Sequence, residues 1–298
     1  KKEIGVSPPV ELETPRTNGD DSKPSVRKNE TILGNLITDG MLAKAREFTG
    51  KDVTFAFQNG GGIRSAIDQG PITVGEVINV LPFGNTLAVR DLTGAELKEA
   101  MEISVGKYPS ENGGFLHLSG GKLVYDATKS VGERVVELYY QNEQGYFVPV
   151  KDAETYTVAT NAFTAKGGDG YTVFAKAYEE GRVTDLGLSD WENFRDHLIN
   201  IGSKGIPTEI EGRIINLDGK SPSDVPGALP VQPEDEEGPA PGDRKTPGTD
   251  EEKTGQGDKQ QSGNKEQLVE TVKAKVKQKD TKYIVTTNPE ELKDKNVV

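Results

Sequence analysis

Hydrophobic and polar positions follow regular periods only in the middle of the chain, between about Glu30 and Leu217. The first period is helical, because successive apolar residues are four, four, four and three positions apart: Leu33, Ile37, Met41, Ala45 and Phe48. This spacing predicts a helix that buries one face, and Gly50 is placed to end it. The apolar run at residues 53–57 then predicts a short buried strand.

Shorter periodic segments follow as far as residue 217. Helical spacing occurs at residues 74–80, 94–105 and 190–201, and in a segment that begins near residue 171. Strand-like runs occur at residues 86–89, 115–118, 122–125, 134–140, 155–160 and 212–217. Because these helices and strands alternate irregularly, the pattern predicts an α+β domain with a mixed sheet rather than a regular parallel βαβ fold.

The two ends of the chain differ from this middle part. The proline-containing residues 1–24 are predicted to be an extended segment that leads into the domain, or a linker, and residues 25–217 form the domain itself. Residues 218–263 are rich in proline, glycine and acidic residues, which predicts a disordered linker. Residues 264–298 combine a short helical period with a strand-like run, a pattern compatible with the start of a further domain.

Composition narrows the functional classes. A formal net charge of −12 disfavours nonspecific binding to nucleic acids. The chain has no cysteine, which excludes disulfides, thiolate metal sites and cysteine nucleophiles and suits an exported protein. We find no apolar stretch of membrane-spanning length and no signal-peptide pattern, so we expect the chain to be one part of a longer polypeptide.

The turn after the first predicted strand carries candidate binding groups. Three consecutive glycines, residues 60–62, allow the backbone to approach a ligand closely, and their amides are expected to face an anion. Asn59 supplies a donor and an acceptor, and Arg64 supplies a bidentate fork for phosphate or carboxylate. The alternative is a tight glycine turn with a surface arginine. No lysine followed by serine or threonine closes the turn, so it is not a triphosphate-binding loop.

A second glycine-rich turn, KGGDGY at residues 166–171, places Asp169 where its carboxylate can accept hydrogen bonds from a sugar diol. The alternative for Asp169 is a turn former or helix cap. Phe163 precedes this turn, and Phe83 lies in the segment LPFGNT. Both phenylalanines are either core residues or, because they flank flexible turns, a pair that stacks on an aromatic base.

Four segments together resemble a known family. ETILGNLITDGM (30–41), QNGGGIRS (58–65), LPFGNT (81–86) and TNAFTAKGGDGY (160–171) occur in the order and at the intervals of the C-terminal domain of 5′-nucleotidases. That family includes ecto-5′-nucleotidases, UDP-sugar hydrolases and bacterial 2′,3′-cyclic-nucleotide 2′-phosphodiesterases. The resemblance covers residues 25–217 and implies that the domain binds a nucleotide, with the class of nucleotide left open.

The resemblance also implies a role for each matching residue. Phe83 and Phe163 clamp the nucleobase, and Asp169 holds the ribose hydroxyls. Gly61, Gly62 and Gly168 belong to the glycine turns of the same site.

The phosphate side of the implied site contains two arginines. Arg27 and Arg64 match family arginines that contact phosphate, and Asn59 matches an asparagine that contacts substrate. At a position where some members carry another arginine, this chain has Lys23, so a contact from that position is not expected.

The remaining polar residues of these segments have structural interpretations. Asn35 and Asp39 are expected to tie their helix to neighbouring turns, because they lie four residues apart on it. His117 is expected to be a strand residue near the pocket wall rather than a catalyst, although a polar amide is typical at this position. His197 and its neighbour Asp196 show no metal-ligand pattern.

Members of the family hydrolyse phosphate esters with two divalent metal ions, such as zinc or manganese, held in a separate N-terminal metallophosphoesterase domain. We therefore expect this chain to contain no catalytic residue and no metal or other cofactor, and to select nucleotides for that domain of the same polypeptide. The implied setting is nucleotide catabolism and phosphate or nucleoside salvage by an extracellular, cell-wall-associated or periplasmic enzyme. The alternatives are a noncatalytic nucleotide-binding or cell-surface interaction module and a purely structural fragment.

Overall fold

The computed structural model describes residues 2–13, 16–17, 20 and 22–230, and it confirms the predicted α+β class with mixed sheets. The larger sheet has five strands, in the spatial order β3 (Leu116–Ser119), β1 (Phe55–Asn59), β7 (Thr155–Asn161), β2 (Thr86–Thr93) and β8 (Val183–Ser189). The smaller sheet has four strands, in the order β6 (Phe147–Pro149), β5 (Val135–Gln141), β4 (Gly121–Tyr125) and β9 (Ile214–Asn216). Both sheets are mixed, because β1 pairs with β7 and β4 pairs with β9 in parallel while the other pairs are antiparallel.

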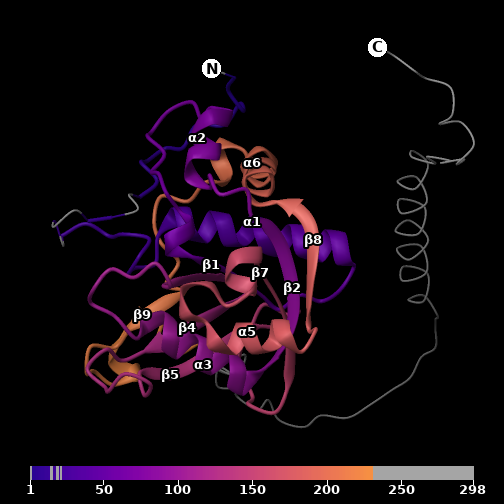
Figure 1. Ribbon diagram of the computed structural model, residues 1–298. Helices are drawn as coiled ribbons and strands as arrows, with labels where there is room; N and C mark the ends of the chain where they lie inside the picture. The colour runs from indigo at the N-terminus through magenta and orange to yellow at the C-terminus, as the bar shows by residue number, and fades with distance from the viewer. Residues whose placement is uncertain (1, 14–15, 18–19, 21, 231–298) are drawn as a thin grey trace, which may run out of the picture. The chain divides into compact units, whose positions relative to one another are not determined.

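The five-stranded sheet is covered on both faces. On one side lie α1 (Ile32–Thr49), α2 (Val74–Val80) and α6 (Asp190–Ile201); on the other lie α3 (Gly94–Val105), α5 (Thr172–Glu179) and the smaller sheet (Figure 1). All five residues of β1 are buried, because successive side chains point to opposite faces of the sheet. Ala56 packs in the core on the α1 side, and Phe55 and Phe57 pack in the core on the α3 side. Short elements complete the fold: α4 (Ala162–Ala165), η1 (Gly60–Gly62), η2 (Gly168–Gly170), η3 (Ser203–Gly205) and η4 (Pro222–Asp224).

Local capping explains why several helices were predicted with their observed bounds. Thr73 and Thr93 form capping boxes at the starts of α2 and α3, with Glu76 and Glu96 as the reciprocal partners. Helix α1 ends as predicted, with Gly50 in the left-handed region at φ 61°. In contrast, the predicted burial of Phe48 is wrong, because this side chain is 57% exposed. The last turn of α1 therefore extends beyond the residues that pack against this helix.

The packed core reaches into both flanking segments. Val6 and Leu12 belong to the same cluster as α1, and Leu12 exchanges backbone hydrogen bonds with Ile67. At the other end, Leu217 and Ala228 are buried against the smaller sheet. Part of the segment predicted to be a disordered linker is thus packed. Residues 231–263 of that segment, and the helix and strand predicted within residues 264–298, lie outside the described residues.

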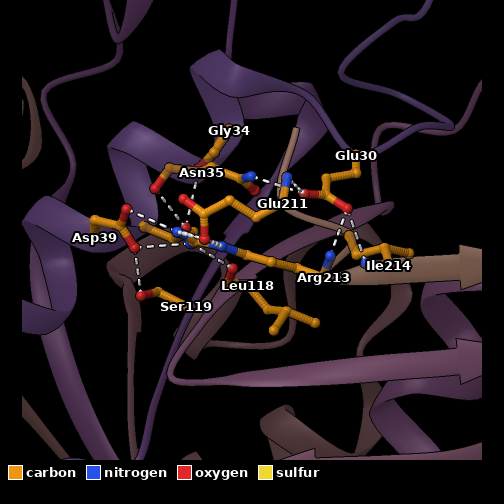
Figure 2. A network of polar contacts seen from close by, with 10 residues as sticks. Glu30, Gly34, Asn35, Asp39, Leu118, Ser119, Glu211, Arg213 and Ile214 are labelled. Atoms are coloured by element: carbon orange, nitrogen blue, oxygen red, sulfur yellow. Dashed lines mark hydrogen bonds and ion pairs between the residues drawn. The ribbon is translucent and has the colours of Figure 1, made fainter. Parts of the chain in front are cut away.

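Glu30 joins α1 to β9. Its carboxylate accepts hydrogen bonds from the Asn35 side chain at 2.8 Å and from three backbone amides near the start of β9: Glu211, Arg213 and Ile214 (Figure 2). The side chain is only 4% exposed, so these donors replace the water that the carboxylate loses on burial. Asn35 therefore has the structural role predicted for it.

Asp39 makes the second link between α1 and the residues that lead into β9. It forms a bidentate ion pair with Arg213, at 2.7 and 2.9 Å, and accepts a hydrogen bond from the hydroxyl of Ser119 (Figure 2). This geometry confirms the prediction that Asp39 ties its helix to neighbouring segments.

Among the residues that the structure describes, every helix is too short or too polar to cross a bilayer.

Candidate functional site

The candidate binding segments of the sequence analysis lie together at one edge of the five-stranded sheet. Strands β1 and β7 run parallel, so their C-terminal ends, at Asn59 and Asn161, lie at the same edge. Strand β2 begins at that edge too, because Leu87 pairs with Asn161 in an antiparallel ladder. Strand β3 also begins there, with Leu116 opposite Asn59. The connections that follow or precede these strand ends are therefore brought together by the sheet topology.

A cavity of about 300 Å³ lies at this edge. It is lined by residues from five separate segments of the chain: Arg27, Asn59, Gly61, Gly62, Arg64, Phe83, Asn85, Gly113, Phe163 and Asp169. Of the predicted site residues only Gly168 is not part of the lining. Asn85 and Gly113 were not predicted. Asn85 follows Phe83 in LPFGNT, and Gly113 lies in the turn-forming sequence ENGG, which is the only signal either position carried.

The two phenylalanine side chains are exposed rather than part of the core. Phe83 is 61% exposed and Phe163 is 47% exposed. The guanidinium carbon of Arg64 lies 5.7 Å from the centre of the Phe83 ring, a distance typical of a cation–π contact. Gly168 supports the other ring, because a Cβ at this position would lie 2.4 Å from a ring carbon of Phe163. The core interpretation of these two residues is therefore wrong, and both rings face one cavity.

A chain of side-chain amides fixes the floor of the cavity. Asn59 donates to Asp169 at 2.7 Å and accepts from Asn161 at 2.8 Å, and Gln58 donates to Asn59 as well. Asn161 also caps α4 by accepting from the backbone amide of Thr164. The network therefore sets the position of Asp169 and of the short helix that carries Phe163. Asp169 itself adopts the left-handed backbone conformation, at φ 58°.

The glycine turn does not have the predicted anion-facing amides at its first two positions. The amides of Gly60 and Gly61 donate to the carbonyl oxygens of Phe115 and Gly113, both at 2.7 Å. Glycine is needed here for a different reason, since a Cβ at Gly60 would lie 2.1 Å from the carbonyl oxygen of Val26. The prediction that these amides face a ligand is thus wrong for Gly60 and Gly61. Their role is to let three backbone segments pack closely.

Two arginines place positive charge on the cavity. Arg27 is 8% exposed, and no described group accepts a hydrogen bond from its Nε. Burial lowers the pKa of Arg27 and the positive charges of Arg16 and Arg64 lower it further, against the opposite effect of the Glu111 and Asp169 carboxylates. Arg64, which follows the glycine turn at residues 60–62, is exposed. Lys23 does not line the cavity. A guanidinium that is desolvated beside like charges is stabilised by an anion, so the site favours an anionic ligand.

His117 supports this wall of the cavity from behind. It lies in β3, is fully buried, and its Nε2 forms a 2.8 Å hydrogen bond with the carbonyl oxygen of Val26, next to Arg27. Burial lowers the pKa of His117 to about 4, so the ring is neutral and Nε2 is the donor. The prediction of a strand residue rather than a catalyst agrees with this position.

This burial predicts a pH dependence of stability. The ring of His117 is protonated near pH 6.5 in the unfolded chain but near pH 4 in the folded chain. Its contribution is therefore fully present above pH 6.5 and is lost, by about 3 kcal/mol, as the pH falls to about 4. We expect His117→Gln, which keeps a donor near Val26 but does not titrate, to lose less stability between pH 7.5 and 4 than the wild type. Urea unfolding at both pH values measures this difference, and equal losses in the two proteins would contradict it.

The described residues do not fit a metal centre. His117 is buried with Nε2 bonded to Val26, and His197 lies in α6. Within the described part of the chain, no three His, Cys, Asp or Glu side chains are grouped so that they would hold a metal ion. The cavity offers a ligand aromatic rings, side-chain amides, guanidinium groups and the carboxylate of Asp169.

Comparison with known protein families identifies relatives of this domain. The family model for the C-terminal domain of 5′-nucleotidases matches residues 10–176. The trifunctional nucleotide phosphoesterase protein YfkN of Bacillus subtilis is 45% identical over 195 residues, covering 65% of this chain and 13% of that protein. A snake venom 5′-nucleotidase of Macrovipera lebetinus is 35% identical over 204 residues, covering 65% of this chain and 49% of that protein.

A solved structure supports the same relationship. The 5′-nucleotidase precursor from Thermus thermophilus is 42% identical, with a TM-score of 0.64, over 72% of this chain and 39% of that one. The chain thus spans less than half the length of each of these three relatives. The similarity confirms the fold predicted for the middle of the chain.

Proposed function

Residues 10–176 match the C-terminal domain of 5′-nucleotidases, so the chain belongs to the 5′-nucleotidase family. We propose that it is the substrate-recognition domain of a nucleotide phosphohydrolase. The nucleobase lies between the rings of Phe83 and Phe163, and the ribose hydroxyls bond to Asp169. Arg27 and Arg64 bind the phosphate. The domain thereby orients the phosphate ester toward a catalytic centre in an N-terminal metallophosphoesterase domain of the same polypeptide.

The observation that carries this proposal is the composition of the cavity. Two exposed rings, two guanidinium groups and one carboxylate line the same space of about 300 Å³. Stacking on an aromatic side chain contributes about 1–3 kcal/mol per base and tolerates every base. A mononucleotide is the class of ligand that combines a planar aromatic base, a diol for a carboxylate and an anion for guanidinium groups.

The two arginines support the phosphate assignment. Arg27 is nearly buried, and its pKa is lowered by burial and by two neighbouring arginines. A bound phosphate would add to the negative charge that Glu111 and Asp169 supply to Arg27, with the geometry that a guanidinium fork prefers. Asn59 already donates one hydrogen bond to Asp169, so its contribution to substrate binding is chiefly to hold that carboxylate in place.

The chemical step belongs to the partner domain. A pair of divalent ions bound in that domain, such as zinc or manganese, would supply the Lewis-acid chemistry for hydrolysis of the phosphate ester. The described residues of this chain bind and orient the nucleotide and provide no group of three metal-binding side chains. The relatives include a snake venom 5′-nucleotidase and a 5′-nucleotidase precursor, which supports an exported enzyme, and we place the parent protein outside the cytoplasm, at the cell wall or in the periplasm.

A paired measurement of binding and turnover tests this division of labour. We expect the 298-residue chain to bind AMP weakly in a calorimetric titration and to release negligible phosphate from it with added zinc or manganese. A Phe83→Ala/Phe163→Ala variant purified in the same way controls for contaminating phosphatase, because contaminants are unaffected by the loss of the rings. Robust turnover that the wild type shows and the variant lacks would contradict the proposal.

A further inference from the structure

The connection that carries Phe83 is held at its two ends and exposed between them. Leu81, directly after α2, is 2% exposed and packs in the core. Pro82, Phe83 and Gly84 are exposed, and Gly84 takes the left-handed backbone conformation at φ 64°. Asn85, directly before β2, is half-buried and lines the cavity. The direction of the Phe83 ring therefore depends on how firmly these two ends are fixed.

Asp190 fixes the second end. Its backbone amide donates to the carbonyl oxygen of Asn85 at 2.9 Å, and the backbone amide and side chain of Asn85 lie close enough to its carboxylate to lower the pKa of that group. The carboxylate also accepts from the amide of Trp191 at 2.7 Å, at the start of α6. Ser189 and Thr86 pair across β8 and β2 directly beside this contact. Asp190 is thus bonded to Asn85 through its main chain, and its carboxylate lies beside the polar groups of the same residue.

This carboxylate is costly for the fold. Asp190 is 6% exposed, and burial raises its pKa to about 6 even though hydrogen bonds from Trp191 and Asn85 lower it. Folding therefore gains less from an aspartate here than from a neutral side chain of the same shape.

We propose that Asp190 is a positioning residue for the nucleotide site: by bonding to the main chain of Asn85 and placing its carboxylate between Asn85 and the first turn of α6, it fixes the connection that presents the Phe83 ring and the Asn85 amide to the cavity. This inference rests on the proposed function and adds to it a residue that does not touch the ligand. Without the carboxylate, the Trp191 amide at the start of α6 loses its acceptor and Asn85 loses the negative charge beside its polar groups, so the exposed residues between Leu81 and Asn85 gain freedom. Binding then requires ordering this segment, which lowers affinity without removing any contact group.

A double-mutant cycle distinguishes this role from a general effect on folding. AMP is titrated into the 298-residue chain at pH 8, with Trp191 fluorescence as a check that each variant is folded. We expect Asp190→Ala to weaken binding about tenfold and Asp190→Asn, which keeps the shape but not both acceptors, to weaken it by a smaller factor. In a Phe83→Ala background Asp190→Ala should cost clearly less than tenfold, because only the Asn85 amide is left to position, whereas in a Phe163→Ala background the tenfold loss should persist.

The matched control is Asp196→Ala, on the exposed face of the same helix, where Asp196 pairs with Arg195; its affinity should equal that of the wild type. Equal affinities of the wild type and both Asp190 variants would overturn this inference and leave the proposed function intact. Equal losses in the Phe83→Ala and Phe163→Ala backgrounds would also overturn it. If the wild type does not bind AMP, the proposed function fails, and this inference with it.

Discussion

Removal of both rings by Phe83→Ala/Phe163→Ala is expected to weaken AMP binding at least about thirtyfold. Each stacked ring contributes about 1–3 kcal/mol, and together the two contribute about 2–6 kcal/mol. The rings are 61% and 47% exposed, so their removal leaves no core cavity and the free energy of unfolding should change little. Calorimetric titration gives the affinity, and urea unfolding gives the stability. The single variants should each show part of the loss.

The control for this prediction is Phe48→Ala, which removes another exposed ring, 57% exposed in the last turn of α1 and not part of the cavity lining. Its affinity for AMP should equal that of the wild type. Wild-type affinity in the double variant would exclude stacking between Phe83 and Phe163 as the basis of nucleotide recognition.

Glu30→Ala is expected to lower the free energy of unfolding by about 3–5 kcal/mol, the largest stability effect that we expect from a single polar side chain of this domain. The substitution leaves three backbone amides of the β9 segment and the Asn35 side chain without their acceptor in a buried place. Because Glu30 joins α1 to β9, the packing of the C-terminal strand on the domain should weaken as well (Figure 2). Urea unfolding followed by circular dichroism measures the loss.

Glu211→Ala provides the comparison, because Glu211 pairs with the same Arg213 while its side chain is 52% exposed. An exposed ion pair contributes about 1 kcal/mol or less, so this variant should be nearly as stable as the wild type. A loss in Glu30→Ala no larger than that in Glu211→Ala would show that the four hydrogen bonds to Glu30 do not stabilise the fold.

The predictable part of this fold is the part with strong local signals. Helices α2, α3 and α6 have the predicted bounds, and in α2 and α3 a threonine cap and a reciprocal glutamate mark the first turn. Strands β6 and β8 were missed. β6 has only three residues, and no residue of β8 is fully buried, so neither shows the alternation that identifies a half-buried strand. The capping signals are local in sequence, whereas strand pairing at a sheet edge depends on distant residues.

The candidate site follows the same division. The residue types around the two glycine turns pointed to groups that do line one cavity, because the parallel pairing of β1 and β7 brings both turns to one edge. The way those groups are held was not predictable. The amide chain through Asn161 and Gln58, and the anchoring of Asn85 by Asp190, depend on contacts between residues far apart in sequence. The amides of Gly60 and Gly61 were assigned to a ligand because nothing in the sequence shows that Phe115 and Gly113 lie opposite them.

The most direct test of the central claim is a crystal structure of the 298-residue chain soaked or grown with AMP. The account predicts the adenine ring between Phe83 and Phe163, the ribose hydroxyls at Asp169 and the phosphate at Arg27 and Arg64. A nucleotide bound elsewhere, for example in the larger cavity of about 980 Å³ beside Asp39 and Arg213, with the space between the two rings empty, would contradict it.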